Sequence, residues 1–337
     1  MSAESGTYRL DVYTRTTDIL EQAKPNIEKG PLFTAKGTET GCEVLLNFAE
    51  HDRPSTSFKP ETFFQHLTTR TQGSVLATAS TLPSTQTLLQ DNPGHFPHGT
   101  VCVADRQIKG KGRGKNTWES PEGCLMFSTS VHLSIQGQSL PFVQYVVSLA
   151  IVQAVQEEAK KRLKDNVVDV RIKWPNDIYG QKLKLGGILC QSAYRNQQFH
   201  VVIGVGLNLS NQQPTTCIDA LIEEKHHEIN LEGSPQPVKP EVLLAGILNR
   251  LEELLDVLLS SSFEPLQKPY LDAWLHTGQK VILEESQGGN MQQIPLTIQG
   301  LSSNGYLKAQ DEKGEQYELH PDGNSLDFFK GLMRKKA

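Results

Sequence analysis

The sequence predicts an α+β protein, in which a mixed sheet with helices is followed by a small β-barrel. Long helical patterns at 141–163 and 241–260 stand among short apolar strands, and only strands are expected beyond residue 276. The chain has 337 residues, a length that favours about two domains. We therefore expect an N-terminal extension over 1–60, a central domain over 61–275 and a C-terminal domain over 276–337.

Composition narrows the class of protein. The chain carries 33 Lys and Arg against 38 Asp and Glu, a net charge of −5, which opposes a general nucleic-acid binder. Its five cysteines are widely spaced without a C-x-x-C pair, so we expect reduced thiols. The close histidine pairs lack neighbouring ligands, so no metal site is predicted. The N-terminus lacks a signal peptide and no apolar run approaches ~20 residues, so we expect a cytoplasmic protein without a membrane partner.

Periodicity and turn residues locate the elements of the central domain. The hydroxyls at 84–85 are typical of a helix start, and Pro141 opens the first long helix. The segment 210–240, rich in Pro, Gln and Glu, is expected to be a loop. Strands are predicted at 100–105, 124–133, 168–174, 188–193 and 199–207, the last two as a hairpin.

A basic, glycine-rich stretch at 105–118 is the strongest functional signal. Its glycines allow close approach of the backbone to a ligand, and Trp118 offers an aromatic face. It lacks the spacing of a P-loop. A solvated loop and a nucleic-acid patch are alternatives, but a position between two strands of an acidic chain favours a site for a phosphate or carboxylate. Its basic residues are Arg106, Lys109, Lys111, Arg113 and Lys115.

Three shorter motifs follow along the chain. Arg-Ile-Lys-Trp-Pro-Asn-Asp at 171–177 brings polar groups to a strand end, where function is common, although an ordinary turn has the same pattern. Lys-Leu-Gly-Gly at 184–187 indicates close packing of a strand on a ligand or on a neighbouring segment. Gly-Val-Gly-Leu-Asn at 204–208 is a lone G-x-G, which is poor support for a dinucleotide fold.

Taken in chain order, these motifs resemble those of the biotin–protein ligases. The resemblance covers about residues 75–275 and includes the Ser-Pro-x-Gly that follows Trp118. Segments at 214–217 and 317–324 are similar to the plant holocarboxylase synthetases, and no helix-turn-helix of the repressor type precedes the core. The resemblance implies a catalytic core like that of the class II synthetases, followed by an SH3-like β-barrel.

The resemblance also implies an activity. Such ligases use ATP to form biotinyl-5′-AMP and then transfer biotin to one lysine of a carrier domain, with Mg²⁺ as the metal ion. The implied partners are the biotin carboxyl carrier domains of carboxylases of the acetyl-CoA carboxylase and methylcrotonyl-CoA carboxylase type. The enzyme is expected as a monomer or a homodimer.

The resemblance assigns roles to single residues. Arg113, Lys184 and Asp177 are expected to be catalytic. Asn176 and Asp177 serve either ATP and Mg²⁺ or the incoming amine, and Lys111 stands where many members have arginine, which weakens bidentate binding. The residues expected to bind biotin or nucleotide are Ser84, Thr85, Gln86, Gln107, Lys111, Gly112, Arg113, Trp118, Lys173, Asn176, Lys184, Gly187 and Asn208.

Three other functions compete with this interpretation. A lipoate–protein ligase shares the chemistry and the core, but the glycine-rich motif and the C-terminal domain favour biotin. A nucleic-acid-binding regulator would use the basic stretch, which the net charge opposes. A catalytically inactive biotin-binding protein is disfavoured because Arg113 and Lys184 are both present.

Overall fold

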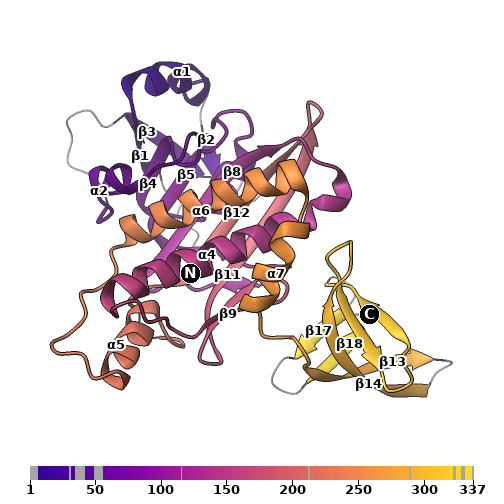
Figure 1. The fold of residues 1–337 in the computed structure, drawn as a ribbon. Coiled ribbons are helices and arrows are strands. Elements are labelled where there is room, and N and C mark those ends of the chain that lie inside the picture. Colours follow the sequence, from indigo (N-terminus) through magenta and orange to yellow (C-terminus); the bar gives the residue numbers. More distant parts are fainter. Residues whose placement is uncertain are drawn as a thin grey trace, which may run out of the picture.

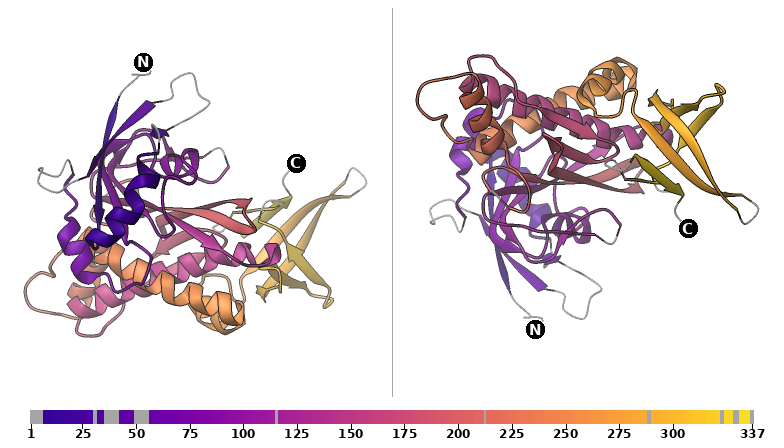
Figure 2. Two further views of the ribbon diagram at one scale, coloured as in Figure 1. Left: turned by 90° about the horizontal axis from the view of Figure 1, so that it is seen from above. Right: turned by 90° about the horizontal axis from the view of Figure 1, so that it is seen from below.

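The computed structural model describes residues 7–29, 32–34, 42–48, 56–114, 116–211, 213–287, 290–321, 324–327 and 331–335. A ten-stranded mixed sheet carries most of the helices, and a second, six-stranded sheet lies at one end of the molecule (Figures 1 and 2). The predicted fold class, a mixed sheet with helices plus a small β-domain, is confirmed.

The large sheet has the strand order β2-β3-β1-β4-β5-β8-β12-β11-β10-β9. Because β1 pairs in parallel with β3 and antiparallel with β4, the described part of the N-terminal 60 residues continues the central sheet. The strands are β1 (Tyr8–Thr14), β2 (Leu32–Thr34), β3 (Cys42–Phe48), β4 (Val75–Leu82), β5 (Val101–Gln107), β8 (Cys124–Leu133), β9 (Val170–Lys173), β10 (Asp177–Gly180), β11 (Leu183–Arg195) and β12 (Gln198–Asn208).

Helices cover the sheet in two hydrophobic clusters. The larger cluster includes α4 and α6, which cross one face of the sheet (Figure 1). The smaller cluster joins α1 and α3 to β1, β4 and β5. The segment 210–240 was expected to be a loop but contains α5, whose apolar positions Ile218, Leu221 and Ile222 are buried. The helices are α1 (Thr17–Ile27), α2 (Pro60–His66), α3 (Thr85–Asp91), α4 (Pro141–Arg162), α5 (Ile218–Glu228), α6 (Pro240–Ser261) and α7 (Glu264–Ala273).

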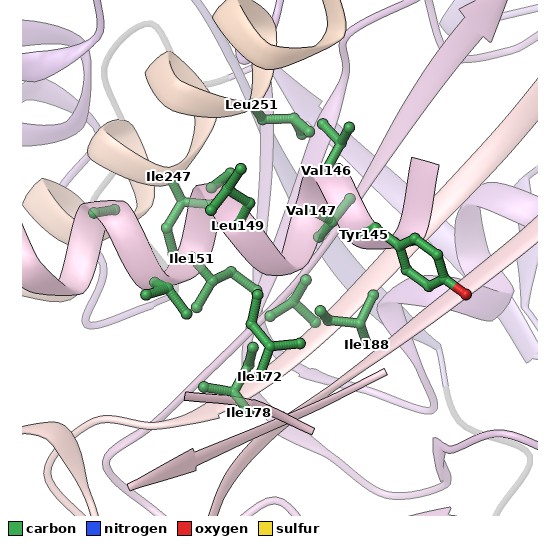
Figure 3. Packing of buried hydrophobic residues seen from close by; sticks show 14 of the residues in the cluster. Tyr145, Val146, Val147, Leu149, Ile151, Ile172, Ile178, Ile188, Ile247 and Leu251 are labelled. Carbon is green, nitrogen blue, oxygen red and sulfur yellow. The ribbon is translucent and has the colours of Figure 1, made fainter. Parts of the chain in front are cut away.

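Helix α4 forms the centre of the core. Figure 3 shows its side chains between Ile247 and Leu251 of α6 on one side and Ile172, Ile178 and Ile188 of the sheet on the other. This double burial explains why α4 is apolar on nearly all sides. The segment 137–162 has the length and composition of a membrane-spanning helix, but 67% of its most apolar window is buried within the protein.

The C-terminal sheet has the order β16-β15-β14-β13-β18-β17. Neighbouring strands are antiparallel except for the parallel pair of β13 and β18. This all-β domain agrees with the predicted SH3-like unit. The strands are β13 (Lys280–Gln287), β14 (Asn290–Leu301), β15 (Leu307–Asp311), β16 (Gln316–Leu319), β17 (Asn324–Asp327) and β18 (Leu332–Lys335).

A buried histidine joins the two sheets. His276 is 0% exposed, its Nε2 accepts the Trp174 N–H at 2.9 Å, and its Nδ1–H donates to Gln279 Oε1 at 2.8 Å. This pattern requires a neutral ring. Burial lowers the pKa of His276 to about 4, with the charge of Lys173 acting in the same direction and the Gln279 hydrogen bond against it.

The first prediction concerns the pH dependence of stability. The pKa of His276 is about 4 in the folded protein against 6.5 as its ordinary value, so the unfolded chain binds more protons between these limits. The contribution of His276 to the free energy of unfolding is therefore fully present above pH 6.5. It is lost as the pH drops toward 4, and the loss is ~3 kcal/mol. Urea unfolding at several pH values measures this dependence. The slope of the unfolding free energy against pH should be shallower for His276→Gln than for the wild type. An unchanged slope would contradict the assignment.

Candidate functional site

A cavity of about 480 Å³ lies over the strand ends of the large sheet. Its walls include the small hairpin of β6 (Gly110–Lys111) and β7 (Thr117–Trp118), and Pro321 of the C-terminal domain. The cavity brings together all but one of the predicted ligand residues. Those that line it are Ser84, Thr85, Gln86, Gln107, Lys111, Gly112, Arg113, Trp118, Lys173, Asn176, Asp177, Lys184 and Gly187.

Strand register builds the floor of the cavity. Asp177 pairs with Lys173 on β9 and with Gly187 on β11, and Gly187 pairs in turn with Gly206 on β12. Directly paired residues of neighbouring strands project on the same face of a sheet. The register therefore places two charged side chains beside two glycines in a single row.

The start of α3 forms one end of the cavity. The Ser84 hydroxyl accepts the Thr87 N–H at 3.4 Å and so caps the helix, as predicted. Ser84, Thr85 and Gln86 are only 1–3% exposed. Short polar side chains that begin a helix beside a cavity give it a hydrogen-bonding lining.

A buried network of uncharged groups fixes these side chains. Gln107 Oε1 accepts the Thr85 N–H at 2.8 Å, and the Thr85 hydroxyl lies 2.8 Å from the Ser128 hydroxyl. Ser128 donates to Gln86 Oε1 at 3.2 Å, and Gln86 Nε2 donates to the Val202 carbonyl at 3.1 Å. We call this end of the cavity the polar recess. It suits a neutral ligand rich in hydrogen-bonding groups.

Glycines on two strands make room for Trp118. A β-carbon at Gly206 would lie 2.3 Å from the indole ring, and one at Gly187 would lie 3.5 Å from it. The ring therefore lies directly over the backbone of this glycine pair. Lys184 Nζ lies 5.9 Å from the centre of the same ring, within the range of a cation–π contact.

Three charged groups form the other end of the cavity. Lys184 Nζ lies 2.8 Å from Asp177 Oδ1, and Lys173 Nζ lies 3.6 Å from Asp177 Oδ2. One carboxylate thus faces two ammonium groups, which leaves an excess of positive charge. Asp177 is the only carboxylate among the described residues that line the cavity. The arrangement favours an anionic ligand at this end.

The basic stretch divides between the cavity and solvent. Lys111 and Arg113 line the cavity on the β6–β7 hairpin, whose turn is closed by the Gly112 N–H and the Asn116 carbonyl at 2.9 Å. Arg106 and Lys109 are exposed and do not line it. Lys115 lies outside the described residues. The stretch therefore supplies two of its cations to the site.

Two asparagines predicted to bind ligand form hydrogen bonds within the protein instead. Asn176 lines the cavity, but its side-chain Nδ2 donates to the Ile188 carbonyl at 3.0 Å. Asn208 is the predicted ligand residue that does not line the cavity. It is 4% exposed, and its side-chain amide donates to Thr215 Oγ1 at 3.2 Å. The Thr215 hydroxyl in turn donates to the Lys184 carbonyl.

Sequence reasoning missed several residues of the cavity. Ser128 lies on a predicted strand, where alternation is the only signal for the direction of its side chain, whereas the G-x-G motif of Gly204 and Gly206 carries no predicted ligand role. Trp174 was noted only as part of its motif. Pro321 reaches the cavity from the C-terminal domain, and no local pattern predicts that contact.

The cavity offers few of the groups that are common in covalent catalysis. Its described lining contains no histidine or cysteine, and the hydroxyls of Thr85 and Ser128 are held in the recess network. Burial raises the pKa of the neighbouring Cys124 thiol to about 11, so this thiol stays neutral. No group of three His, Cys, Asp or Glu side chains suited to a metal ion occurs among the described residues.

The part of the chain that forms most of the cavity matches a known protein family. The model of the biotin/lipoate A/B protein ligase family matches residues 78–208. Biotin–protein ligase 2 of Arabidopsis thaliana is 45% identical over 281 residues, which is 83% of each chain. The chloroplastic biotin–protein ligase 1 of the same plant is 44% identical over 280 residues, 83% of this chain and 74% of its own.

Solved structures share the fold. The biotin protein ligase from Aquifex aeolicus in complex with biotin and ATP superposes with a TM-score of 0.52 at 24% identity. The match covers 72% of this chain and 94% of that one. A point mutant of the same Aquifex protein, in complex with biotin, gives a TM-score of 0.54 over the same shares.

The second prediction tests the contact between Trp118 and the glycine pair. Gly206→Ala adds a methyl group where the indole ring lies, so the β6–β7 hairpin must move away from the sheet. Limited proteolysis should then cut within the 110–118 hairpin at least ~5-fold faster than in the wild type. Gly246→Ala on α6 is the matched control, because its methyl group would meet nothing closer than 3.7 Å. Equal cleavage rates in the two variants would contradict the contact.

Proposed function

The chain belongs to the biotin–protein ligase family, and we propose that the cavity described above performs both steps of its reaction. The enzyme is an ATP-dependent ligase that attaches biotin to protein. The arrangement of a neutral recess, an aromatic ring and a cationic end in one cavity supports this proposal. In this proposal the polar recess holds the uncharged rings of biotin and the cationic end holds its carboxylate with the phosphates of ATP.

In the first step, an oxygen of the biotin carboxylate attacks the α-phosphorus of ATP. The bond from that phosphorus to the pyrophosphate oxygen breaks, and biotinyl-5′-AMP and pyrophosphate form. Both reactants are anions, so the site must offset their repulsion and the charge that develops on the phosphate. In this proposal Lys184 and Lys173 carry this task, whereas Lys111 and Arg113 on the hairpin retain the product of the step.

In the second step, the acceptor lysine attacks the carbonyl carbon of the mixed anhydride. The new amide bond forms and the bond to the AMP oxygen breaks, while the lysine ammonium gives up two protons to solvent, one before the attack and one as the amide forms. We assign the first contact with the incoming ammonium to Asp177, because an anion bound by Lys173 and Lys184 competes with its two salt bridges. The carboxylate is then available to a new cation.

We propose that Mg²⁺ binds with ATP at the same end of the cavity. Mg²⁺ is commonly held by one or two carboxylates together with substrate phosphates. Asp177 provides one carboxylate and the phosphates would supply the other oxygens, so Mg²⁺ bound with ATP would share this residue with the acceptor amine. When bound, the ion supplies positive charge at the α-phosphate.

The acceptor is proposed to be the biotin carboxyl carrier domain of a carboxylase. We propose carboxylases of the acetyl-CoA and methylcrotonyl-CoA types as substrates and the cytoplasm as the location, with the monomer or homodimer as the active form. The lipoate ligase and nucleic-acid regulator alternatives are not favoured, because the relatives compared above are biotin–protein ligases.

The direct test is transfer of labelled biotin to a purified carrier domain. Labelling should require ATP and should disappear when the acceptor lysine is changed to arginine. Lipoate in place of biotin should give no product. Incorporation of lipoate, or labelling without ATP, would overturn the proposal.

The third prediction separates the two steps. Lys184→Ala should slow pyrophosphate release by about 10²-fold or more, because adenylate formation loses a cation beside the reacting phosphate. Arg113→Ala should retain pyrophosphate release but lower carrier labelling, because the adenylate escapes. Lys109→Ala is the matched control on the same stretch, since Lys109 is exposed and outside the cavity. Normal pyrophosphate release by Lys184→Ala would refute its role.

A further inference from the structure

We propose that Tyr145 is a positioning residue, whose hydroxyl couples the docking of the C-terminal β-domain to the nucleotide end of the cavity. The inference rests on the proposed function, because it assigns ATP to the cationic end. Tyr145 lies on the core helix α4 and outside the cavity lining. It therefore acts through other residues and does not touch the substrates.

One hydroxyl joins three separate segments at this point. The Tyr145 hydroxyl donates to the Gly305 carbonyl at 2.5 Å and accepts the Trp174 Nε1–H at 2.7 Å. Trp174 lines the cavity and directly follows Lys173, whereas Gly305 belongs to the turn between β14 and β15. The side chain of Tyr145 is 1% exposed, so water does not compete for these bonds.

The turn is shaped to receive this ring. Gly305 has φ +79°, and a β-carbon there would lie 3.1 Å from Tyr145 Cε2 and 3.2 Å from Phe142 Cε1. The turn is closed by hydrogen bonds from the Gly305 N–H to the Ser302 carbonyl and from the Ser302 N–H to the Tyr306 carbonyl. Close packing and a closed turn together fix the position of the Gly305 carbonyl.

The same junction reaches the wall of the cavity. The Tyr306 ring lies 3.7 Å from that of His320, and the next residue, Pro321, lines the cavity. Burial raises the pKa of the Tyr145 hydroxyl, whereas the Trp174 hydrogen bond and the positive charge of Arg113 lower it. The junction is therefore close enough to Arg113 to feel its charge. The side chains that form the polar recess do not belong to this junction.

The first arm of the test measures adenylate formation by Tyr145→Phe. This change removes both hydrogen bonds and keeps the packed ring. We expect roughly 10-fold lower kcat/KM for ATP in pyrophosphate release, with the KM for biotin within about twofold of the wild type. A general loss of structure would change both substrates alike. Gly305→Ala disturbs the junction from the C-terminal domain. It should lower the kcat/KM for ATP in the same way and leave the KM for biotin unchanged.

Tyr270→Phe is the matched control. Tyr270 is equally buried and its ring lies 4.9 Å from that of Tyr145, but its hydroxyl has no hydrogen-bond partner among the described residues. This variant should keep the kcat/KM for ATP within about twofold.

The second arm reports on the junction independently of activity. Hydrogen exchange of the Ser302 and Gly305 amides should be at least ~5-fold faster in Tyr145→Phe than in Tyr270→Phe. Equal exchange and equal kinetics in the two variants would overturn the inference, as would an equal loss toward biotin and ATP. An inactive wild type would instead refute the proposed function, and the exchange arm would still test the junction.

Discussion

Strand register is the constraint on which the site depends. Lys173, Asp177, Gly187 and Gly206 occupy paired positions on four successive strands of the large sheet. A shift of one residue in any pairing would turn a side chain to the opposite face. Such a shift would bury a charge under α4 or remove the space for Trp118. The apolar residues next to these positions, including Ile172 and Ile178, pack in the core and so hold the register against slipping.

Much of this arrangement could be predicted from the sequence, because it follows from local patterns. Strict alternation located the strand that ends at Lys173, and the periodicity of apolar residues located α4 and α6 within a few residues. The polar residues predicted to bind ligand stand at strand and helix ends. Backbone geometry alone brings such positions to one edge of the sheet.

The remainder depends on contacts between distant segments. Helix α5 could not be predicted from the sequence because most of its residues are polar. Only a few of its positions are apolar, and these pack against the core. The need for glycine at 206 comes from Trp118, which is 88 positions away in the sequence. Pro321 reaches the cavity only because the C-terminal domain docks beside it. Composition alone does not show which cations of the basic stretch line the cavity. Lys111 and Arg113 lie on a hairpin that folds over the cavity, whereas Arg106 and Lys109 precede this hairpin.

The two ends of the cavity differ in how their polar groups are satisfied. In the polar recess, hydroxyls and amides bond one another, so their geometry is set before a neutral ligand arrives. At the cationic end, gathering ammonium groups without a counter-ion would destabilise the fold through mutual repulsion. Asp177 offsets this repulsion through its salt bridges to Lys173 and Lys184. A chain with a net charge of −5 can thus keep a local excess of positive charge in one cavity.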